Sequence, residues 1–411
     1  MKFSLTAACA AALCLGACGG DPAAPAPIRM DSGGGRQVAG LSPVRDHARI
    51  SNTRDSVGAL HVDGTVFAWG ANQYGQLGIG TTSGSTVPVM VSGLSSIKEV
   101  RGGAYHMAAI RQDGTVWTWG NNSWGQLGVG GMSSVVSRAR LVTGLSNVTA
   151  LAAGTYHTAA LTSGGAVWTW GYFPGKSSST PVRTAGLAMA VRSVAAGQDF
   201  NLALGVDGKL YGWGGNSYGQ LGNGTRSSSS AFPGHVYGLD NVTAVSAGAS
   251  HSLALRADGT VWAWGNNADG QLGVTSGDGT QARPVAGLPT PLDGGASIKA
   301  IVAGGRNSAV VYADASVWMW GSNGYGQYGD GSVQSSSVPV RLNALADVAA
   351  ITIGEGFVSV LKRDGSVFGI GYNRMGQLGN NTMYLPSRTP VQVVGLSGIG
   401  YLRLGAGEAA R

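Results

Sequence analysis

The sequence predicts an all-β protein: a seven-bladed β-propeller with about four antiparallel strands per blade, closed by N- and C-terminal strands. Three observations predict this fold. An aromatic-x-Trp-Gly signature recurs at near-regular spacing, a tight-turn signal precedes every copy, and the 411 residues include 70 glycines but only 11% charged residues. Such a composition is typical of short strands joined by tight turns, and no window shows helical periodicity over a helical length.

The aromatic signature defines the repeat. It occurs at 67–70, 117–120, 168–171, 211–214, 262–265 and 318–321, with a degenerate seventh copy at 368–371. Successive copies are 43 to 56 residues apart, a period typical of propeller blades. The two rings of a copy are two positions apart and therefore point to one face of a strand. We expect both rings to be buried core; among them are Trp119, Trp170, Trp264 and Trp320.

The other strands of a blade follow from the rest of each unit. A segment of small residues, such as 152–154, opens the unit and suits a crowded central channel. An alternating run such as 157–161 comes next and leads to a turn, Asp-Gly in most units, which is the strongest short signal for a hairpin. Six units then carry Gly-Gln-Leu-Gly or a close variant. A Pro-Val segment follows in most units and predicts an edge strand.

Ring closure is expected to use the C-terminus. The first unit has Ser51-Asn52-Thr53 where other units have small residues, and the chain ends with 401–405, which has the pattern of an opening strand. We therefore predict that 401–405 completes the first blade, because this would remove the open edges of a linear array.

The first 17 residues have the features of an export signal: Lys2, an apolar stretch from Leu5 to Leu15 and small residues before a cysteine. The sequence Leu-Gly-Ala-Cys that ends at Cys18 resembles a bacterial lipobox, in which the cysteine becomes the lipidated first residue. The predicted organisation is a lipoprotein signal peptide at 1–17, lipidated Cys18 with a flexible tether at 18–48, and the propeller at 49–411. The alternative is a plain secretory signal with a fortuitous Cys18.

The residue after Cys18 is glycine, which gives no indication of retention in the inner membrane. We expect an exported protein at the outer membrane or cell surface whose lipid is its only membrane contact. The basic residues are scattered, so nothing predicts a nucleic-acid partner. We expect a monomer.

The fullest repeat combines Gly103-Ala-Tyr-His106 with Asp113-Gly-Thr-Val-Trp-Thr-Trp-Gly120 and Gly125-Gln-Leu-Gly128. This pattern resembles the regulator of chromosome condensation repeat family over roughly residues 49 to 411. The resemblance implies the propeller fold. The family's founder is a guanine-nucleotide exchange factor that acts through a β-wedge protruding from one face. This chain has no wedge-sized insertion between its repeats, so exchange activity is an alternative by analogy alone.

Four aromatic residues directly precede the Gly-Gln-Leu-Gly loops: Tyr74, Trp124, Tyr218 and Tyr325. Tyrosine and tryptophan on a rim are typical of interface hot spots. The alternative is that each ring packs its loop against the next blade, as repeated positions often do. Trp124 is the strongest candidate for a partner contact, because it is the only tryptophan outside the aromatic signature.

His106, His157 and His251 recur at one position of the repeat. Equivalent points on different blades should lie too far apart to share a metal ion, so we predict a structural role and no metal or other cofactor. No catalytic motif is present. The predicted function is a scaffold that binds a protein or a glycan through one propeller face. The alternative is an enzyme with a composite site at the central depression, which motifs would not show.

Overall fold

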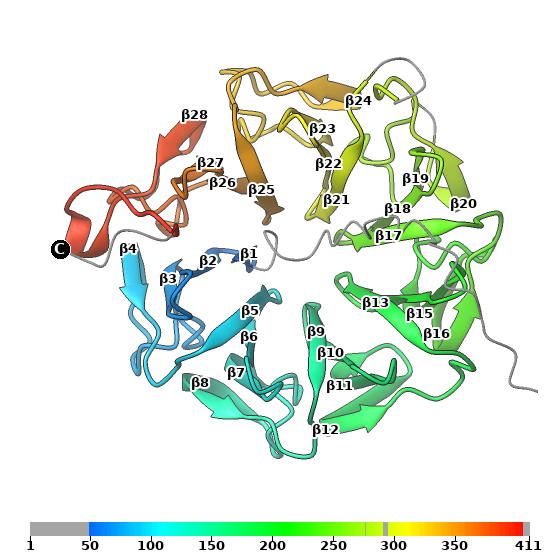
Figure 1. Cartoon of the computed structure of the whole chain (residues 1–411), viewed down its shortest axis with the longest axis horizontal. Coiled ribbons are helices and arrows are strands. Elements are labelled where there is room, and N and C mark those ends of the chain that lie inside the picture. The colour runs from blue at the N-terminus through cyan, green and yellow to red at the C-terminus, as the bar shows by residue number, and fades with distance from the viewer. Residues whose placement is uncertain (1–48, 276, 291–294, 406–411) are drawn as a thin grey trace, which may run out of the picture. The chain divides into compact units, whose positions relative to one another are not determined.

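Seven four-stranded antiparallel sheets surround a central axis in the computed structural model, which describes residues 49–275, 277–290 and 295–405 (Figure 1). The predicted seven-bladed propeller is confirmed. The predicted signal peptide, Cys18 and the tether up to residue 48 lie outside the described residues. Blades are numbered one to seven in chain order, and each blade's strands pair in chain order, from the first near the axis to the fourth at the rim.

Each blade uses four consecutive strands. Blade one contains β1 (Ile50–Asn52), β2 (Ser56–Leu60), β3 (Val66–Gly70) and β4 (Ser85–Met90), and blade two β5 (Ile97–Gly102), β6 (His106–Arg111), β7 (Val116–Asn122) and β8 (Ser133–Leu141). Blade three contains β9 (Val148–Ala153), β10 (His157–Thr162), β11 (Val167–Phe173) and β12 (Lys176–Arg183), and blade four β13 (Val191–Ala196), β14 (Phe200–Gly205), β15 (Leu210–Asn216) and β16 (Ser227–His235).

The remaining blades have the same order. Blade five contains β17 (Val242–Ala247), β18 (His251–Arg256), β19 (Val261–Gly265) and β20 (Gly279–Pro284), and blade six β21 (Ile298–Gly304), β22 (Asn307–Tyr312), β23 (Val317–Gly321) and β24 (Ser336–Arg341). Blade seven contains β25 (Val348–Ile353), β26 (Phe357–Lys362), β27 (Val367–Gly371) and β28 (Ser387–Gln392), followed by the 3-10 helix η2 (Leu396–Gly398). Within the described ranges, no helix has the length and apolar character that a membrane crossing requires.

The second ring of the aromatic signature forms the core between neighbouring blades. The tryptophans at this position, and Ile370 in blade seven, are at most 1% exposed. The indole Nε1 of Trp119 donates to the carbonyl of Gln76 in the preceding blade at 2.9 Å. The same bond joins Trp170 to Gln126, Trp264 to Gln220 and Trp320 to Gln271, at 2.9, 2.8 and 2.9 Å. Blades two, three, five and six are thereby tied to the Gly-Gln-Leu-Gly loop of the preceding blade.

The first ring of the signature differs from the prediction. It is only partly buried in every blade except blade four, where Tyr211 is buried. Arg111 lies 4.6 Å from the ring centroid of Trp117, and Arg256 lies 5.5 Å from that of Trp262. The first ring therefore packs against the core clusters without being fully buried, because cationic side chains and solvent cover its outer side in part.

Blade three departs from the repeat because it has no Gly-Gln-Leu-Gly loop. A tight turn at Pro174-Gly175 joins β11 to β12, and Phe173 is buried at 2% exposure in the cluster that holds Trp213 of blade four. The carbonyl that would accept a hydrogen bond from Trp213 is missing. Its Nε1 is accordingly a buried donor with no hydrogen-bond partner among the described residues.

Blades one and seven close the ring through the same contacts that join other blades. Trp69 Nε1 donates to the carbonyl of Gln377 at 3.0 Å. A Cβ on Gly376 would lie 3.0 Å from the Cα of Thr86 in β4, so the loop of blade seven packs directly on the outer strand of blade one. Gly376 also has a φ of +79°, which favours glycine.

The prediction that residues 401–405 supply the opening strand of blade one is wrong. That strand is β1, which pairs with β2 from Ile50 opposite Ala59. The C-terminal segment forms isolated bridges to Ser366 and Val394 in and beside blade seven. Leu404 N–H does donate to the Gly365 carbonyl at 2.8 Å. Ile97 and Val148, at the start of β5 and β9, make the equivalent bond to the turn of the preceding blade. Leu404 therefore takes the place of the first residue of an opening strand, but the rest of that strand is β1.

Candidate functional site

Five aromatic rings from blades one to three form a continuous row on the face that carries the Gly-Gln-Leu-Gly loops, here called the loop face. The ring centroids of Tyr74 and Tyr105 are 5.3 Å apart, and those of Tyr105 and Tyr156 are 6.1 Å apart. Trp124 continues the row, 5.9 Å from Tyr156 and 4.9 Å from Tyr172. We call these five residues the aromatic ladder. Such spacings are those of favourable ring contacts.

Fixed loops hold the rings of the ladder. The Trp124 N–H donates to Gln126 Oε1 at 2.9 Å, and Gln126 Nε2 donates to Asn121 Oδ1 at 2.8 Å. The Tyr74 N–H makes the equivalent bond to Gln76 at 2.9 Å. The carbonyl of Tyr156 accepts from the Tyr172 N–H at 2.7 Å. The loops are therefore preorganised before any ligand binds.

Arg54 lies at the blade-one end of the ladder. Its Nη1 donates to the Tyr105 hydroxyl at 2.6 Å, and its guanidinium carbon is 5.9 Å from the centroid of the same ring. Its Nε is 3.8 Å from Asp55 Oδ2. Burial raises the pKa of Asp55, and the charge of Glu355 raises it further, although Arg54 opposes both effects.

A cavity of about 580 Å³ opens beside the ladder, between blades six, seven, one and two. Tyr74 and Tyr105 line it on the ladder side. On the other side lie Tyr325 and Tyr372, whose ring centroids are 4.8 Å apart. The remaining lining residues are polar apart from Gly356 and Met375: Arg54, Asp55, Gln73, Arg306, Asn307, Ser322, Gln327, Glu355 and Arg374.

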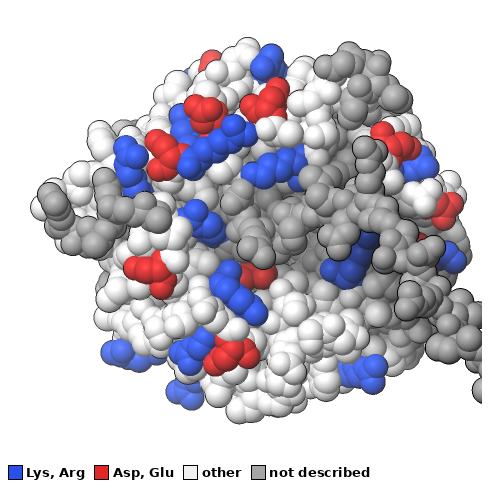
Figure 2. Space-filling model, in the orientation of Figure 1, with Lys and Arg blue, Asp and Glu red and all other residues white. Residues whose placement is uncertain are grey.

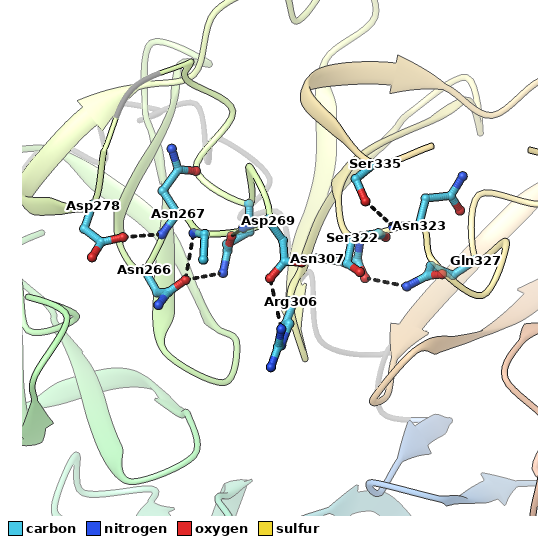
Figure 3. A network of polar contacts seen from close by, with 12 residues as sticks. Asn266, Asn267, Asp269, Asp278, Arg306, Asn307, Ser322, Asn323, Gln327 and Ser335 are labelled. Atoms are coloured by element: carbon cyan, nitrogen blue, oxygen red, sulfur yellow. Dashed lines mark hydrogen bonds and ion pairs between the residues drawn. The ribbon is translucent and has the colours of Figure 1, made fainter. Parts of the chain in front are cut away.

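The charged groups around the cavity are nearly balanced. Arg54 is paired with Asp55, and Arg306 Nη1 is 3.3 Å from Asp269 Oδ2 in blade five, which Figure 3 shows across the two loops. Arg374 and Glu355 are exposed and form no ion pair within the described part of the chain. On the face drawn in Figure 2, charges of both signs are interspersed. The site therefore presents no strong field of one sign.

The three repeated histidines lie in the core, fully buried, and not on this face. His106 Nε2 is 2.8 Å from Thr158 Oγ1, and His251 Nε2 is 3.0 Å from Ser308 Oγ. The Thr158 and Ser308 hydroxyls donate their own protons to glutamine carbonyls, so both histidines must donate from Nε2. His157 Nε2 lies 3.0 Å from Asn201 Oδ1, which can only accept.

Each histidine thus joins its blade to the next as a neutral ring. Burial lowers the pKa to about 3 for His106 and to about 4 for His157 and His251. The glycine three residues earlier makes room for the ring, since a Cβ on Gly103 would lie 2.3 Å from His106 Cε1. Among the described residues, no group of three or more His, Cys, Asp or Glu side chains could hold a metal ion.

The structure places the four predicted rim residues differently. Trp124 and Tyr74 belong to the ladder, and Trp124 is 45% exposed. Tyr325 lines the cavity at 47% exposure. Tyr218 is 42% exposed and has no ring partner in the described ranges.

Sequence reasoning missed the other half of the site: Arg54, Tyr105, Tyr156, Tyr172 and Tyr372. A signal existed. The residue directly before the histidine position changes from blade to blade, reading Asp55, Tyr105, Tyr156, Asp199, Ser250, Arg306 and Gly356. Variation at a repeated, solvent-facing position indicates individual function more than architecture.

The fold and this face define a class of protein: a propeller whose regular core carries an irregular, preorganised loop face. A model of the RCC1-like domain matches residues 173–410, and the regulator of chromosome condensation (RCC1) repeat matches residues 63–110 and 113–161. The chain belongs to the RCC1 repeat family, which confirms the resemblance in its sequence.

Similar proteins include the ultraviolet-B receptor UVR8 of Arabidopsis thaliana, 31% identical over 53% of this chain and 52% of its own length. The mitochondrial RCC1 domain-containing protein RUG3 of the same plant is 31% identical over 64% of this chain. The match spans 62% of RUG3, so both relatives are matched over less than two thirds of their length.

Solved structures show the same fold. Yeast RCC1 (Prp20), in a complex with Kap60, superposes with a TM-score of 0.74 at 21% identity, covering 86% of each chain. Human WBSCR16 superposes with a TM-score of 0.69 at 24% identity, covering 80% of this chain and 94% of its own. At these identities the likeness concerns the fold alone.

Proposed function

We propose that the protein is an exported, lipid-anchored propeller that binds a protein or a glycan through its loop face. The aromatic ladder is the observation that carries this proposal. Its five rings come from three blades. Trp124 and Tyr172 are exposed and the other three rings are half-buried, whereas the core is already filled by the buried tryptophans. Exposed, preorganised aromatic residues beside arginine are the typical composition of binding hot spots.

The anchor is tested by Cys18→Ser. We expect this variant to lose incorporation of a labelled fatty acid and to appear in the soluble fraction, because one lipidated residue is the proposed membrane contact. Cys14→Ser is the matched control and should keep both label and membrane association. Retained membrane association in the Cys18→Ser variant without label would contradict the anchor.

Binding through the ladder is tested at Trp124. A photo-crosslinking amino acid at position 124, in living cells, should trap a partner that the same probe at Tyr237 does not; Tyr237 is 57% exposed but lies in blade four. For the trapped partner, Trp124→Ala should weaken binding roughly tenfold to thirtyfold, the loss typical of a hot-spot aromatic. If the Trp124→Ala and Tyr237→Ala variants bound the partner with equal affinity, the aromatic ladder would be excluded as its binding surface.

One observation favours a second candidate, an enzyme with a composite site. Asp55 and Glu355 line the same cavity, and burial raises the pKa of Asp55. A carboxyl group with a raised pKa can retain a proton and act as a general acid. The test is whether a bound ligand is chemically converted. Conversion that Asp55→Asn abolishes while binding persists would establish an enzyme. A ligand that binds without being converted would support the binding scaffold instead.

A further inference from the structure

We infer that the loop face binds a neutral glycan chain, with one sugar in the cavity and the adjoining sugars on the aromatic ladder. This inference rests on the proposed function and names the ligand class of the same face.

Charge balance is the first argument. The three arginines that line the cavity, Arg54, Arg306 and Arg374, face the carboxylates of Asp55 and Glu355, and Asp269 pairs with Arg306 from outside. The total is three positive and three negative groups. An anion would have to approach Glu355 and Asp55, and a cation would have to approach the arginines. A neutral ligand meets no such repulsion.

Hydrogen bonding is the second argument. Polar lining residues of the cavity bond to one another: Asn307 Nδ2 donates to the Ser322 carbonyl at 2.6 Å, and the Tyr325 N–H donates to Gln327 Oε1 at 3.0 Å. Figure 3 labels Asn307, Ser322 and Gln327. Three exposed lining side chains have no ion pair or side-chain hydrogen bond in the described part of the chain: Arg374 can donate, Glu355 can accept, and the Gln73 amide can do both. Sugar hydroxyls donate and accept, so they can use both kinds of group at once.

The arrangement of the rings is the third argument. Aromatic rings lie on both sides of the cavity, Tyr74 and Tyr105 on one side and Tyr325 and Tyr372 on the other. From Tyr105 the ladder continues through Tyr156 to Trp124. A sugar ring has an apolar C–H face that packs on an aromatic face while its hydroxyls stay hydrated. Tyr105 and Tyr156 stack on each other, so the rings open to sugars are the exposed ones, Tyr325 at the cavity and Trp124 and Tyr172 at the far end of the ladder. Exposed rings at both ends of the row suit a chain of several sugars.

The size of the cavity separates this ligand from a folded protein. Its volume of about 580 Å³ lies within the range of about 300–1,000 Å³ that small-ligand sites occupy. Its lining is mostly polar, whereas the centre of a protein interface is depleted in charged residues. A protein partner is the competing occupant, and the test below distinguishes the two.

The test is calorimetric titration of the full-length chain in detergent with neutral hexasaccharides of glucose, mannose, xylose and N-acetylglucosamine, in several linkages, and with the anionic hexamer of galacturonic acid. We expect a neutral hexasaccharide to bind with an affinity that is unchanged between about 50 and about 500 mM salt. Trp124→Ala and Tyr372→Ala should each weaken it roughly tenfold. Tyr237→Ala, on another blade, should leave it unchanged.

Binding of the galacturonate hexamer alone, lost at high salt, would overturn the inference, as would failure of every neutral hexasaccharide. The crosslinking experiment at position 124 separates this failure from failure of the proposed function. A protein trapped there without any glycan binding would keep the loop face as a binding surface and reject the glycan.

Discussion

Acidification from pH 7 to pH 5 is expected to destabilise the propeller by roughly 6 kcal/mol through three histidines. Burial lowers the pKa of His106 to about 3 and of His157 and His251 to about 4, whereas an unfolded chain titrates near about 6.5. The unfolded state therefore binds more protons below about pH 6.5. The stability that the neutral rings contribute is complete above that pH and is lost as the pH falls towards the folded pKa values.

The magnitude follows from the number of groups. Each histidine that takes up a proton only on unfolding costs about 1.4 kcal/mol per pH unit, so three cost about 4 kcal/mol per unit. Protonation inside the fold would place a charge in the core. It would also turn Nδ1 into a donor, and in the described part of the chain that atom has no hydrogen-bond partner in any of the three histidines.

Urea unfolding at pH values from about 7.5 to about 4.5 measures this slope. His251→Phe should reduce it by about one proton while the fold is kept, because Phe200 and Phe357 occupy the same position in blades four and seven. His235→Gln is the control, since His235 is exposed. An unchanged slope in His251→Phe would show that this histidine is already accessible to protons in the folded state.

The repeat itself allowed the fold to be predicted, because a signature copied seven times specifies strand order, turn and core together. Closure was not predictable in the same way. The pattern of residues 401–405 is that of an opening strand, but β1 already occupies that place, so the C-terminal segment pairs with blade seven instead. Local pattern specifies the kind of element, whereas competition for one position depends on the whole ring.

The site was predictable only in part for a related reason. Tyr105 and Tyr156 are 51 residues apart, which is one repeat, so their proximity was implied by the period. Arg54 and Tyr372 line one cavity only because blades one and seven meet. When the blades are considered one at a time, the sequence indicates exposed rings such as Trp124 but not the surface that these rings form together.

Trp264→Ala is expected to destabilise the protein by about 3–5 kcal/mol, because it empties a fully buried site between blades four and five. A sharper comparison uses phenylalanine. Trp264→Phe loses packing volume and the 2.8 Å hydrogen bond to the Gln220 carbonyl. Trp213→Phe loses similar volume, but the Trp213 Nε1 has no acceptor among the described residues, so the substitution removes a buried unsatisfied donor.

Removing a buried unsatisfied donor stabilises the folded state by about 1–3 kcal/mol. Trp213→Phe should therefore lower the free energy of unfolding less than Trp264→Phe does, by roughly that amount. Both residues are at most 1% exposed, which makes the pair a matched comparison of packing. Chemical unfolding of the two variants gives the difference. Equal losses of stability in the two variants would mean that Trp213 has an acceptor at the interface between blades three and four, such as a buried water. The missing loop of blade three would then not destabilise the propeller.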